Sequence, residues 1–166
     1  MELQFNLRYE DLVSPTMSPD TYLEQFKGKV TNDFDLYEPE LEILNKIEKL
    51  FKDKKEELKI VVLGAEWCPD CNRNVPRLIK IVKSLKTNTI EFRILYGIKK
   101  NALHKPGEIK WHKTRSPSEA TDPKFDLQKL PTFYFFNKDN KLIGKIEENP
   151  KKTIEEDLLE ILESKN

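Results

Sequence analysis

Cysteine is scarce in this sequence: 166 residues contain only two, Cys68 and Cys71, both in the stretch GAEWCPDCNRNVP. A chain of this length can bury a hydrophobic core without cross-links, so a structural disulfide framework is excluded as the reason for the pair. In the cytosol, where thiols are kept reduced, two neighbouring cysteines are more often catalytic, redox-sensing or metal-binding.

Net charge and long apolar runs are also absent. Lys and Arg together number 29, as do Asp and Glu, so the summed field attracts the chain neither to nucleic acid nor to an anionic membrane. No stretch approaches the roughly 20 apolar residues of a transmembrane helix. The first residues place acids among apolar positions and contain no apolar run of signal-peptide length. We therefore expect a cytoplasmic protein that binds neither nucleic acid nor membrane.

The hydrophobic pattern predicts two parts. Residues 1–57 are expected to form an N-terminal arm and a helical extension packed on the core, with a short helix between Ser18 and Gly28 and a longer one at about 37–52. Residues 58–166 are expected to form the main domain. Its expected elements are a buried strand at 59–65, a helix at 69–85 kinked by Pro76, a strand at 89–97, an irregular insertion at about 97–124, a hairpin within 130–146, and a C-terminal helix with a Thr153/Glu156 capping box.

The position of the cysteine pair predicts two unequal thiols. A buried strand ends just before Cys68 and a helix begins at Pro69, which puts the Cys68 sulfur at the positive end of a helix. Such settings lower a thiol pKa from about 8.5 to between about 3.5 and 7.5. Cys71, one turn further on, can attack a mixed disulfide at Cys68 and expel the substrate as a thiol. Asp70 acts in both directions, because its charge stabilises the helix start but opposes a neighbouring thiolate.

Several motifs taken together resemble the thioredoxin family. They are AEWCPDC, Pro76 five residues after Cys71, the KFDLQKLPT segment, the hairpin after it and the terminal amphipathic helix, in the family's order over about residues 58–164. The Pro-Asp pair between the cysteines is similar to that of thioredoxin-related cytosolic disulfide reductases. The N-terminal helices resemble those of less characterised bacterial and archaeal thioredoxin-like proteins.

The resemblance implies a thioredoxin-like α/β fold, a three-layer α/β/α sandwich with a central mixed β-sheet. It implies Cys68 as the nucleophile, Cys71 as the resolving thiol, and a cis Leu130–Pro131 peptide facing them. An extended substrate could pair there as an added strand. The implied substrate-binding residues are Trp67, Leu130, Pro131 and Thr132. No bound organic cofactor is required, since the two electrons come from the Cys68/Cys71 dithiol, which becomes the redox-active disulfide Cys68–Cys71.

Two positions depart from the family pattern. Val62 stands where thioredoxins carry a buried acid, six residues before the first cysteine, and Gly64 stands where they carry a tryptophan. Proton handling is therefore expected to differ. Glu66 is the nearest alternative acid in sequence, although it matches a surface position of the family.

The insertion contains a basic stretch. Residues 99–115 hold six basic side chains against one acid, Glu108, together with His104, His112 and Trp111. One interpretation is a basic lid that lowers the pKa of Cys68 and favours anionic or glutathione-like substrates; the other is a solvated loop anchored by one aromatic. A zinc site built from both cysteines and both histidines is disfavoured, because the histidine spacing is wider than the usual zinc-finger range.

These observations favour a thiol–disulfide oxidoreductase that reduces protein or small-molecule disulfides. We expect a monomer that is regenerated by a thioredoxin reductase or a low-molecular-weight thiol. The alternative is a non-catalytic thioredoxin-like binding module or redox sensor. Peroxide reduction at Cys68 is a third hypothesis, disfavoured because the threonine-proline-cysteine context of peroxiredoxins is missing.

Overall fold

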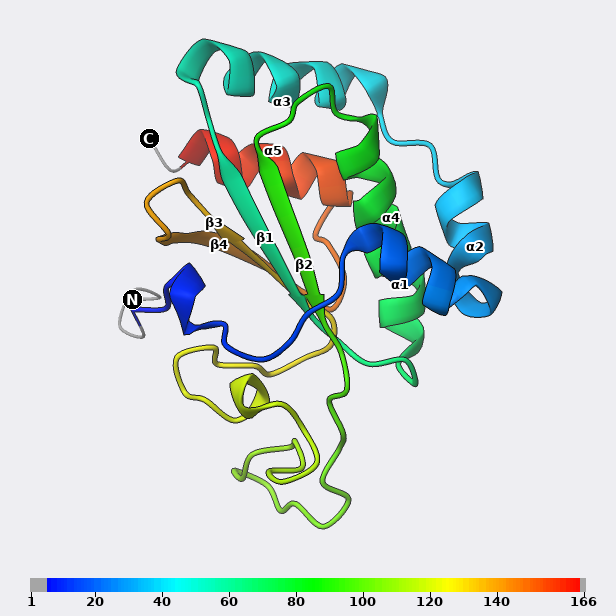
Figure 1. Cartoon of the computed structure of the whole chain (residues 1–166), viewed down its shortest axis with the longest axis vertical. Helices are drawn as coiled ribbons and strands as arrows, with labels where there is room; N and C mark the ends of the chain where they lie inside the picture. The colour runs from blue at the N-terminus through cyan, green and yellow to red at the C-terminus, as the bar shows by residue number, and fades with distance from the viewer. Residues whose placement is uncertain (1–5, 165–166) are drawn as a thin grey trace.

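The computed structural model describes residues 6–164 as a four-stranded sheet packed with helices (Figure 1). The strands are β1 (Leu58–Leu63), β2 (Ile90–Leu95), β3 (Thr132–Phe136) and β4 (Leu142–Glu147). The helices are α1 (Pro19–Gln25), α2 (Lys27–Leu36), α3 (Leu41–Lys54), α4 (Pro69–Ser84) and α5 (Ile154–Ser164), with short 3-10 turns η2 (Tyr9–Asp11) and η3 (Ser118–Ala120). The predicted α/β fold is confirmed.

The sheet is mixed, in the order β2-β1-β3-β4. β1 is parallel to β2 and antiparallel to β3, and β3 is antiparallel to β4. Four successive side chains, Phe133 to Phe136, are all buried, as expected for a strand covered on both faces. Because β1 and β2 are parallel, their carboxyl ends lie at the same end of the sheet, and the segments that follow the two strands lie together there.

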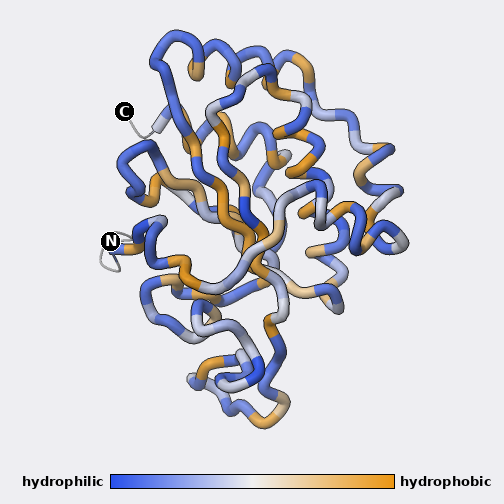
Figure 2. The backbone as a smooth tube through the Cα atoms, in the orientation of Figure 1, coloured by the Kyte–Doolittle hydropathy of each residue, from blue (hydrophilic) through white to orange (hydrophobic). Residues whose placement is uncertain are grey.

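Helices α4 and α5 cover one face of the sheet, and the segments around Tyr9 and Phe125 cover the other. On one face, Ile161 of α5 packs directly against Gly144, which pairs with Phe135, and α4 packs beside α5. On the other face, the Tyr9 ring meets Phe136 at 5.7 Å between ring centroids, and the hydroxyl of Tyr134 donates to the Phe125 carbonyl at 2.8 Å. Figure 2 shows the resulting pattern, with apolar residues concentrated along the central strands.

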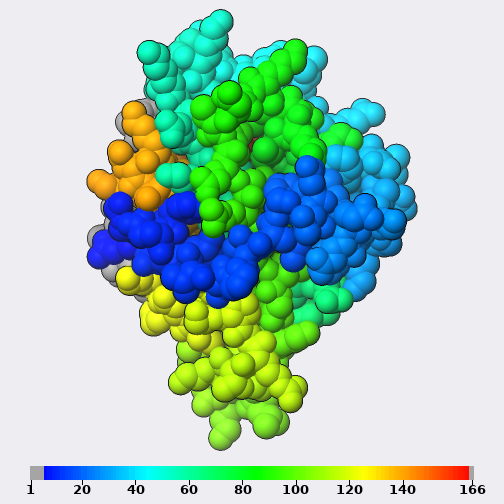
Figure 3. Space-filling view, viewed as in Figure 1, coloured from blue at the N-terminus to red at the C-terminus, as the bar shows by residue number. Residues whose placement is uncertain are grey.

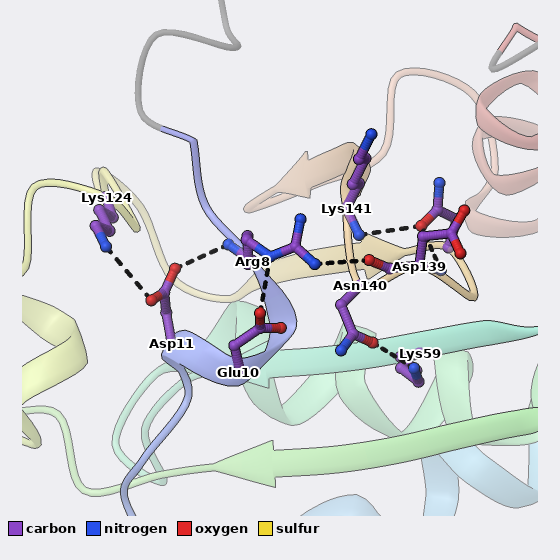
Figure 4. Close-up of polar contacts among 9 residues, drawn as sticks. Arg8, Glu10, Asp11, Lys59, Lys124, Asp139, Asn140 and Lys141 are labelled. Carbon is purple, nitrogen blue, oxygen red and sulfur yellow. Dashed lines mark hydrogen bonds and ion pairs between the residues drawn. The ribbon is translucent and has the colours of Figure 1, made fainter.

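The N-terminal segment links the two edges of the sheet. At one edge Arg8 bridges to Lys141, and its guanidinium donates to the Asp139 carbonyl at 2.9 Å (Figure 4). At the other edge the backbones of Met17 and Ile94 exchange hydrogen bonds of 2.9 and 3.0 Å. The segment therefore crosses the molecule from the hairpin to α1, as the space-filling view shows (Figure 3).

The N-terminal helices differ from the prediction in one respect. Ser18 caps α1 by accepting from the Thr21 N–H, as expected, but α1 ends at Gln25 and Gly28 lies in the first turn of a separate helix, α2. Contacts with α4 explain this second helix, because the Lys80 ammonium donates to the Phe34 carbonyl at 2.8 Å. Tertiary packing thus overrides the stop signal of a single glycine.

The predicted capping box at α5 is present. The Thr153 hydroxyl accepts from the Glu156 N–H at 3.1 Å, and the Glu156 carboxylate accepts from the Thr153 N–H at 3.2 Å. Two orphan donors of the first turn are thereby satisfied.

Segment 97–124 forms an irregular lobe beyond the carboxyl ends of β1 and β2 (Figure 1). Buried Trp111 anchors it, with the indole N–H donating to the Leu127 carbonyl at 2.7 Å. Buried Glu119 ties it to the N-terminal segment by accepting from the Val13 N–H at 2.7 Å and the Ser14 hydroxyl at 2.6 Å. Trp111 is thus the single aromatic anchor that one of the two interpretations of this segment expected. No helix within residues 6–164 has both the length and the apolar character needed to cross a membrane.

Candidate active site

Cys68 occupies the N-cap of α4. Its backbone is extended, with φ −92° and ψ 116°, and Pro69 fills the first helical position, where the missing N–H costs nothing. The Cys68 sulfur accepts from the Cys71 backbone N–H at 3.2 Å. A thiolate formed at this sulfur is therefore met by a donor of the helix start and by the positive end of the helix.

The pKa of Cys68 is lowered from the ordinary value of a thiol to about 7. The largest cause is a hydrogen bond from the Cys71 thiol, followed by burial, which acts in the opposite direction, and then by the backbone N–H groups of Cys71 and Asp70. A large fraction of Cys68 is consequently thiolate at neutral pH.

Cys71 has the opposite character. Its side chain is 0% exposed, compared with 6% for Cys68. Burial raises the pKa of the Cys71 thiol far above its ordinary value, and its hydrogen bond to Cys68 adds to the effect. Both cysteines are free thiols. The structure therefore holds one thiol ready to ionise next to one that keeps its proton.

The loop before β3 faces the cysteines. The Leu130–Pro131 peptide is cis, as the resemblance implied, and the Cys68 sulfur lies 3.6 Å from the Leu130 carbonyl oxygen. Thr132 is fully buried in the sheet, and its hydroxyl donates to the Lys129 carbonyl at 2.7 Å. The structure thus brings the Leu130–Pro131 turn to the Cys68 sulfur and places the buried Thr132 side chain in the sheet next to that turn.

Asn74 joins this loop to α4, a role that the sequence analysis missed. The buried Asn74 amide donates to the Glu148 carbonyl at 2.8 Å, and the Glu148 N–H donates to the Pro131 carbonyl at 2.7 Å. The signal was a polar residue one turn after Cys71 on the apolar face of the helix.

Trp67 flanks the thiols and remains 41% exposed. Its indole N–H donates to the Ile98 carbonyl at 2.9 Å, and the Lys100 ammonium lies 6.0 Å from the centre of its ring. The Lys110 ammonium donates to the Gln128 carbonyl at 3.0 Å, two residues before Leu130. Lys100 of the insertion thus lies beside Trp67, and Lys110 contacts the chain two residues before Leu130.

The acids near the cysteines have different environments. Glu66 is exposed and pairs with Lys29 of α2 at 3.6 Å. Asp70 pairs with Arg73. Its negative charge opposes ionisation of both thiols: it adds to the raised pKa of Cys71 and offsets part of the lowering of the Cys68 pKa. Val62 is fully buried and supplies no acid from β1.

Two tyrosines lie close to Cys71. Tyr22 of α1 and Tyr96, which follows β2, share a hydroxyl–hydroxyl hydrogen bond of 2.8 Å. The sequence analysis assigned no role to either tyrosine. The signal available was that Tyr96 follows a strand parallel to β1, so that it lies at the same sheet edge as the cysteine loop.

The ring nitrogens of both histidines make their hydrogen bonds within the insertion itself. The Nδ1 atom of His104 lies 2.8 Å from the Asn101 carbonyl, and that of His112 accepts from the Arg115 N–H at 3.2 Å. Across residues 6–164, no three His, Cys, Asp or Glu side chains gather in a way that could hold a metal ion.

Comparison with known proteins places this site in a family. A family model described as thioredoxin matches residues 16–106. Among solved structures, a Pseudomonas aeruginosa protein of unknown function has a TM-score of 0.64 at 15% identity, covering 96% of this chain and 99% of its own. An HIV epitope scaffold has a TM-score of 0.57 at 18% identity, covering 94% and 88%. Fasciola hepatica thioredoxin has a TM-score of 0.41 at 23% identity, covering 72% and 91%. No curated protein matches.

The family match begins earlier in the chain than the resemblance read from the sequence, at residue 16 instead of about 58, and so takes in the helices α1 to α3. Since the matched residues make up more than half of the chain and contain Cys68 and Cys71, this protein belongs to the thioredoxin family.

Proposed function

We propose that this protein is a thiol–disulfide oxidoreductase that reduces disulfides of proteins or small molecules. The observation that carries the proposal is the inequality of the two thiols: Cys68, with its pKa lowered to about 7, lies at the helix start, and Cys71 is buried and protonated beside it. This pairing supplies a nucleophile and a resolving group within one turn of helix.

The reaction has two exchange steps. The Cys68 thiolate attacks one sulfur of the substrate disulfide, the substrate S–S bond breaks, and the other substrate sulfur leaves as a thiolate that takes a proton. Cys71 then loses its proton and attacks Cys68, which forms the Cys68–Cys71 disulfide and releases the second substrate sulfur. Two electrons pass from the protein to the substrate, and no organic cofactor takes part.

The substrate is proposed to lie against Trp67 and the Leu130–Pro131 turn. The exposed indole offers an apolar surface, and the turn lies beside the nucleophilic sulfur. Thr132 positions this turn through its bond to Lys129. Lys100 and Lys110 at the same edge favour substrates with acidic groups near the disulfide.

Regeneration of the dithiol requires a thioredoxin reductase or a low-molecular-weight thiol. We further propose that the protein acts in the cytoplasm, where such donors keep a dithiol reduced, and as a monomer.

Insulin reduction with dithiothreitol as the electron donor tests the proposal. We expect turnover by the wild type and its loss in Cys68→Ser and Cys71→Ser. A wild type that fails on insulin and on small disulfides alike would contradict reductase activity and favour the non-catalytic binding module or redox sensor.

A further inference from the structure

The resolving thiol faces a buried pair of phenols across Gly64. A Cβ atom at Gly64 would lie 2.8 Å from Cε1 and 3.4 Å from Cζ of Tyr96, and 3.1 Å from the Cys71 sulfur. The phenol end of the Tyr96 ring and the Cys71 sulfur therefore border the same small space beside Gly64. A glycine at position 64 is what allows this approach, because any side chain there would occupy the space between them.

The phenol pair is held firmly. Tyr22 is 0% exposed, and its ring meets that of Tyr96 edge-on, at 5.2 Å between centroids and 83° between planes. Phe26 packs on both rings, at 5.2 and 5.4 Å. Tyr22 lies in α1 and Phe26 caps its C-terminal end, so residues of the N-terminal extension pack around Tyr96 on the side of the site behind Cys71.

One proton of the hydroxyl pair is available for a third group. In the bond between the Tyr22 and Tyr96 oxygens, a single O–H points at the partner. When Tyr22 donates, the O–H of Tyr96 is free to turn towards the sulfur side of the ring. Burial raises the pKa of both phenols above the ordinary value for tyrosine, so both keep their protons and act as donors at neutral pH.

The resolving step creates a need for such a donor. Cys71 must carry negative charge as it attacks, in a buried position where burial opposes ionisation. In this step Cys68 is bonded to the substrate sulfur and carries no charge, and the charge of Asp70 on α4 is of like sign to the forming thiolate. The backbone N–H of Ala65 is one donor to the sulfur, and the Tyr96 phenol, bonded to that of Tyr22, borders the same space at Gly64.

We infer that Tyr96 donates a hydrogen bond to the Cys71 sulfur as that sulfur becomes a thiolate in the resolving step, and that Tyr22 of the N-terminal extension positions Tyr96 for it. This inference rests on the proposed thiol–disulfide exchange. The Cys71 S–H bond breaks and its proton passes to solvent. The Cys71–Cys68 bond then forms, and the substrate sulfur leaves with the electron pair of its bond to Cys68 and takes up a proton.

A two-phase stopped-flow measurement tests the inference. The reduced protein is mixed with an aromatic disulfide whose thiolate absorbs visible light. Attack by Cys68 releases one thiolate, and resolution by Cys71 releases a second. Tyr96→Phe keeps the ring packing but removes the donor, and a hydrogen bond to a charged group corresponds to a slowing of the second phase by ~10-fold or more. Tyr22→Phe, which removes only the positioning bond, should slow it roughly threefold.

The pH profile separates this role from packing. In Tyr96→Phe the pH profile of the second phase should move to higher pH, while the first phase, governed by Cys68 with its pKa of about 7, should stay in place. Tyr37→Phe is the matched control, since it removes a hydroxyl that donates to Glu155 at 2.6 Å; both of its phases should match the wild type.

Each outcome decides between the two claims. Release of only one thiolate by the wild type would contradict the proposed function itself. Two phases in the wild type with an unchanged second phase in both tyrosine variants would overturn the inference alone. Equal slowing of both phases would also overturn it, because it would indicate damage to packing. Should Tyr96→Phe fail to fold, as judged by near-ultraviolet circular dichroism, Tyr22→Phe carries the same test.

Discussion

Replacing Cys71 separates the two sources of the lowered pKa of Cys68. The largest cause is the hydrogen bond from the Cys71 thiol, and the backbone N–H groups of Cys71 and Asp70 come after it. Cys71→Ala removes the thiol donor and leaves the backbone groups in place. Cys71→Ser keeps a donor at almost the same position. The two variants therefore differ in one hydrogen bond.

The expected shift follows from the strength of that bond. A hydrogen bond to a charged group contributes about 1.5–3 kcal/mol, and one pKa unit corresponds to about 1.4 kcal/mol, so complete loss would raise the pKa by roughly one to two units. In Cys71→Ala the cavity left by the missing sulfur admits water, so Cys68 is less buried, and this offsets part of the expected rise in its pKa. We expect the pKa of Cys68 to rise by about one unit in Cys71→Ala and to stay near 7 in Cys71→Ser.

The assay is the rate of alkylation by iodoacetamide as a function of pH, supported by the ultraviolet absorbance of the thiolate. Both report ionisation of Cys68, since Cys71 is absent from both variants. Equal pKa values in Cys71→Ala and Cys71→Ser would refute the assignment of the largest cause to the thiol hydrogen bond. A wild-type midpoint at or above about 8.5, the ordinary value of a free thiol, would refute the lowered pKa altogether.

Three further predictions concern stability and specificity. Gly64→Ala places a Cβ 2.8 Å from a Tyr96 ring carbon and should lower the free energy of unfolding, measured by urea denaturation, by ~1–3 kcal/mol. Gly28 in α2 has open space around it, so Gly28→Ala should instead raise the free energy of unfolding by ~0.5–1 kcal/mol. Asn74→Ala removes the bond to the Glu148 carbonyl and should cost ~1–3 kcal/mol, whereas Asn72→Ala, which loses an exposed bond to the Glu66 carbonyl, should cost less than ~0.5 kcal/mol. Lys100→Glu combined with Lys110→Glu should lower kcat/KM several-fold for a peptide disulfide flanked by acids, while Lys113→Glu serves as the control in the same segment.

Each of these predictions has a contrary result. Equal stability of the two glycine variants would contradict the close approach at Gly64. Equal losses in the two asparagine variants would contradict the role of Asn74 in joining α4 to Glu148. An unchanged preference between acidic and basic peptide disulfides in the double lysine variant would show that these lysines do not select substrates.

Local patterns were sufficient to predict the elements of the main domain. The β-branched run at 59–65, the helix start at Pro69 and the Thr153 capping box each depend on neighbours within a few residues, and the structure has all three. The helix α2 was missed because its stability comes from α4, through contacts such as that between Lys80 and Phe34. Sequence periodicity carries no information about such a partner.

The cysteine pair could be predicted from the sequence, but its surroundings could not. Cys68 and Cys71 are three residues apart, so one short stretch of sequence was enough to identify them as the candidate pair. Tyr22 and Tyr96 are 74 residues apart, and only the fold brings their hydroxyls together behind Cys71. Glu66 lies near Cys68 in sequence, yet its side chain turns to Lys29 on the surface. Nearness in the chain was a poor guide to the groups around the buried thiol.

Trapping of the mixed disulfide tests the central claim most directly. Reduced Cys71→Ser is incubated with a disulfide substrate such as insulin, and the products are examined by intact mass and peptide mapping. We predict a covalent adduct at Cys68 that accumulates in Cys71→Ser and none in Cys68→Ser, while the wild type proceeds to the Cys68–Cys71 disulfide. An adduct that forms equally well through Cys71 in Cys68→Ser, or no adduct in either variant, would contradict the assignment of Cys68 as the nucleophile.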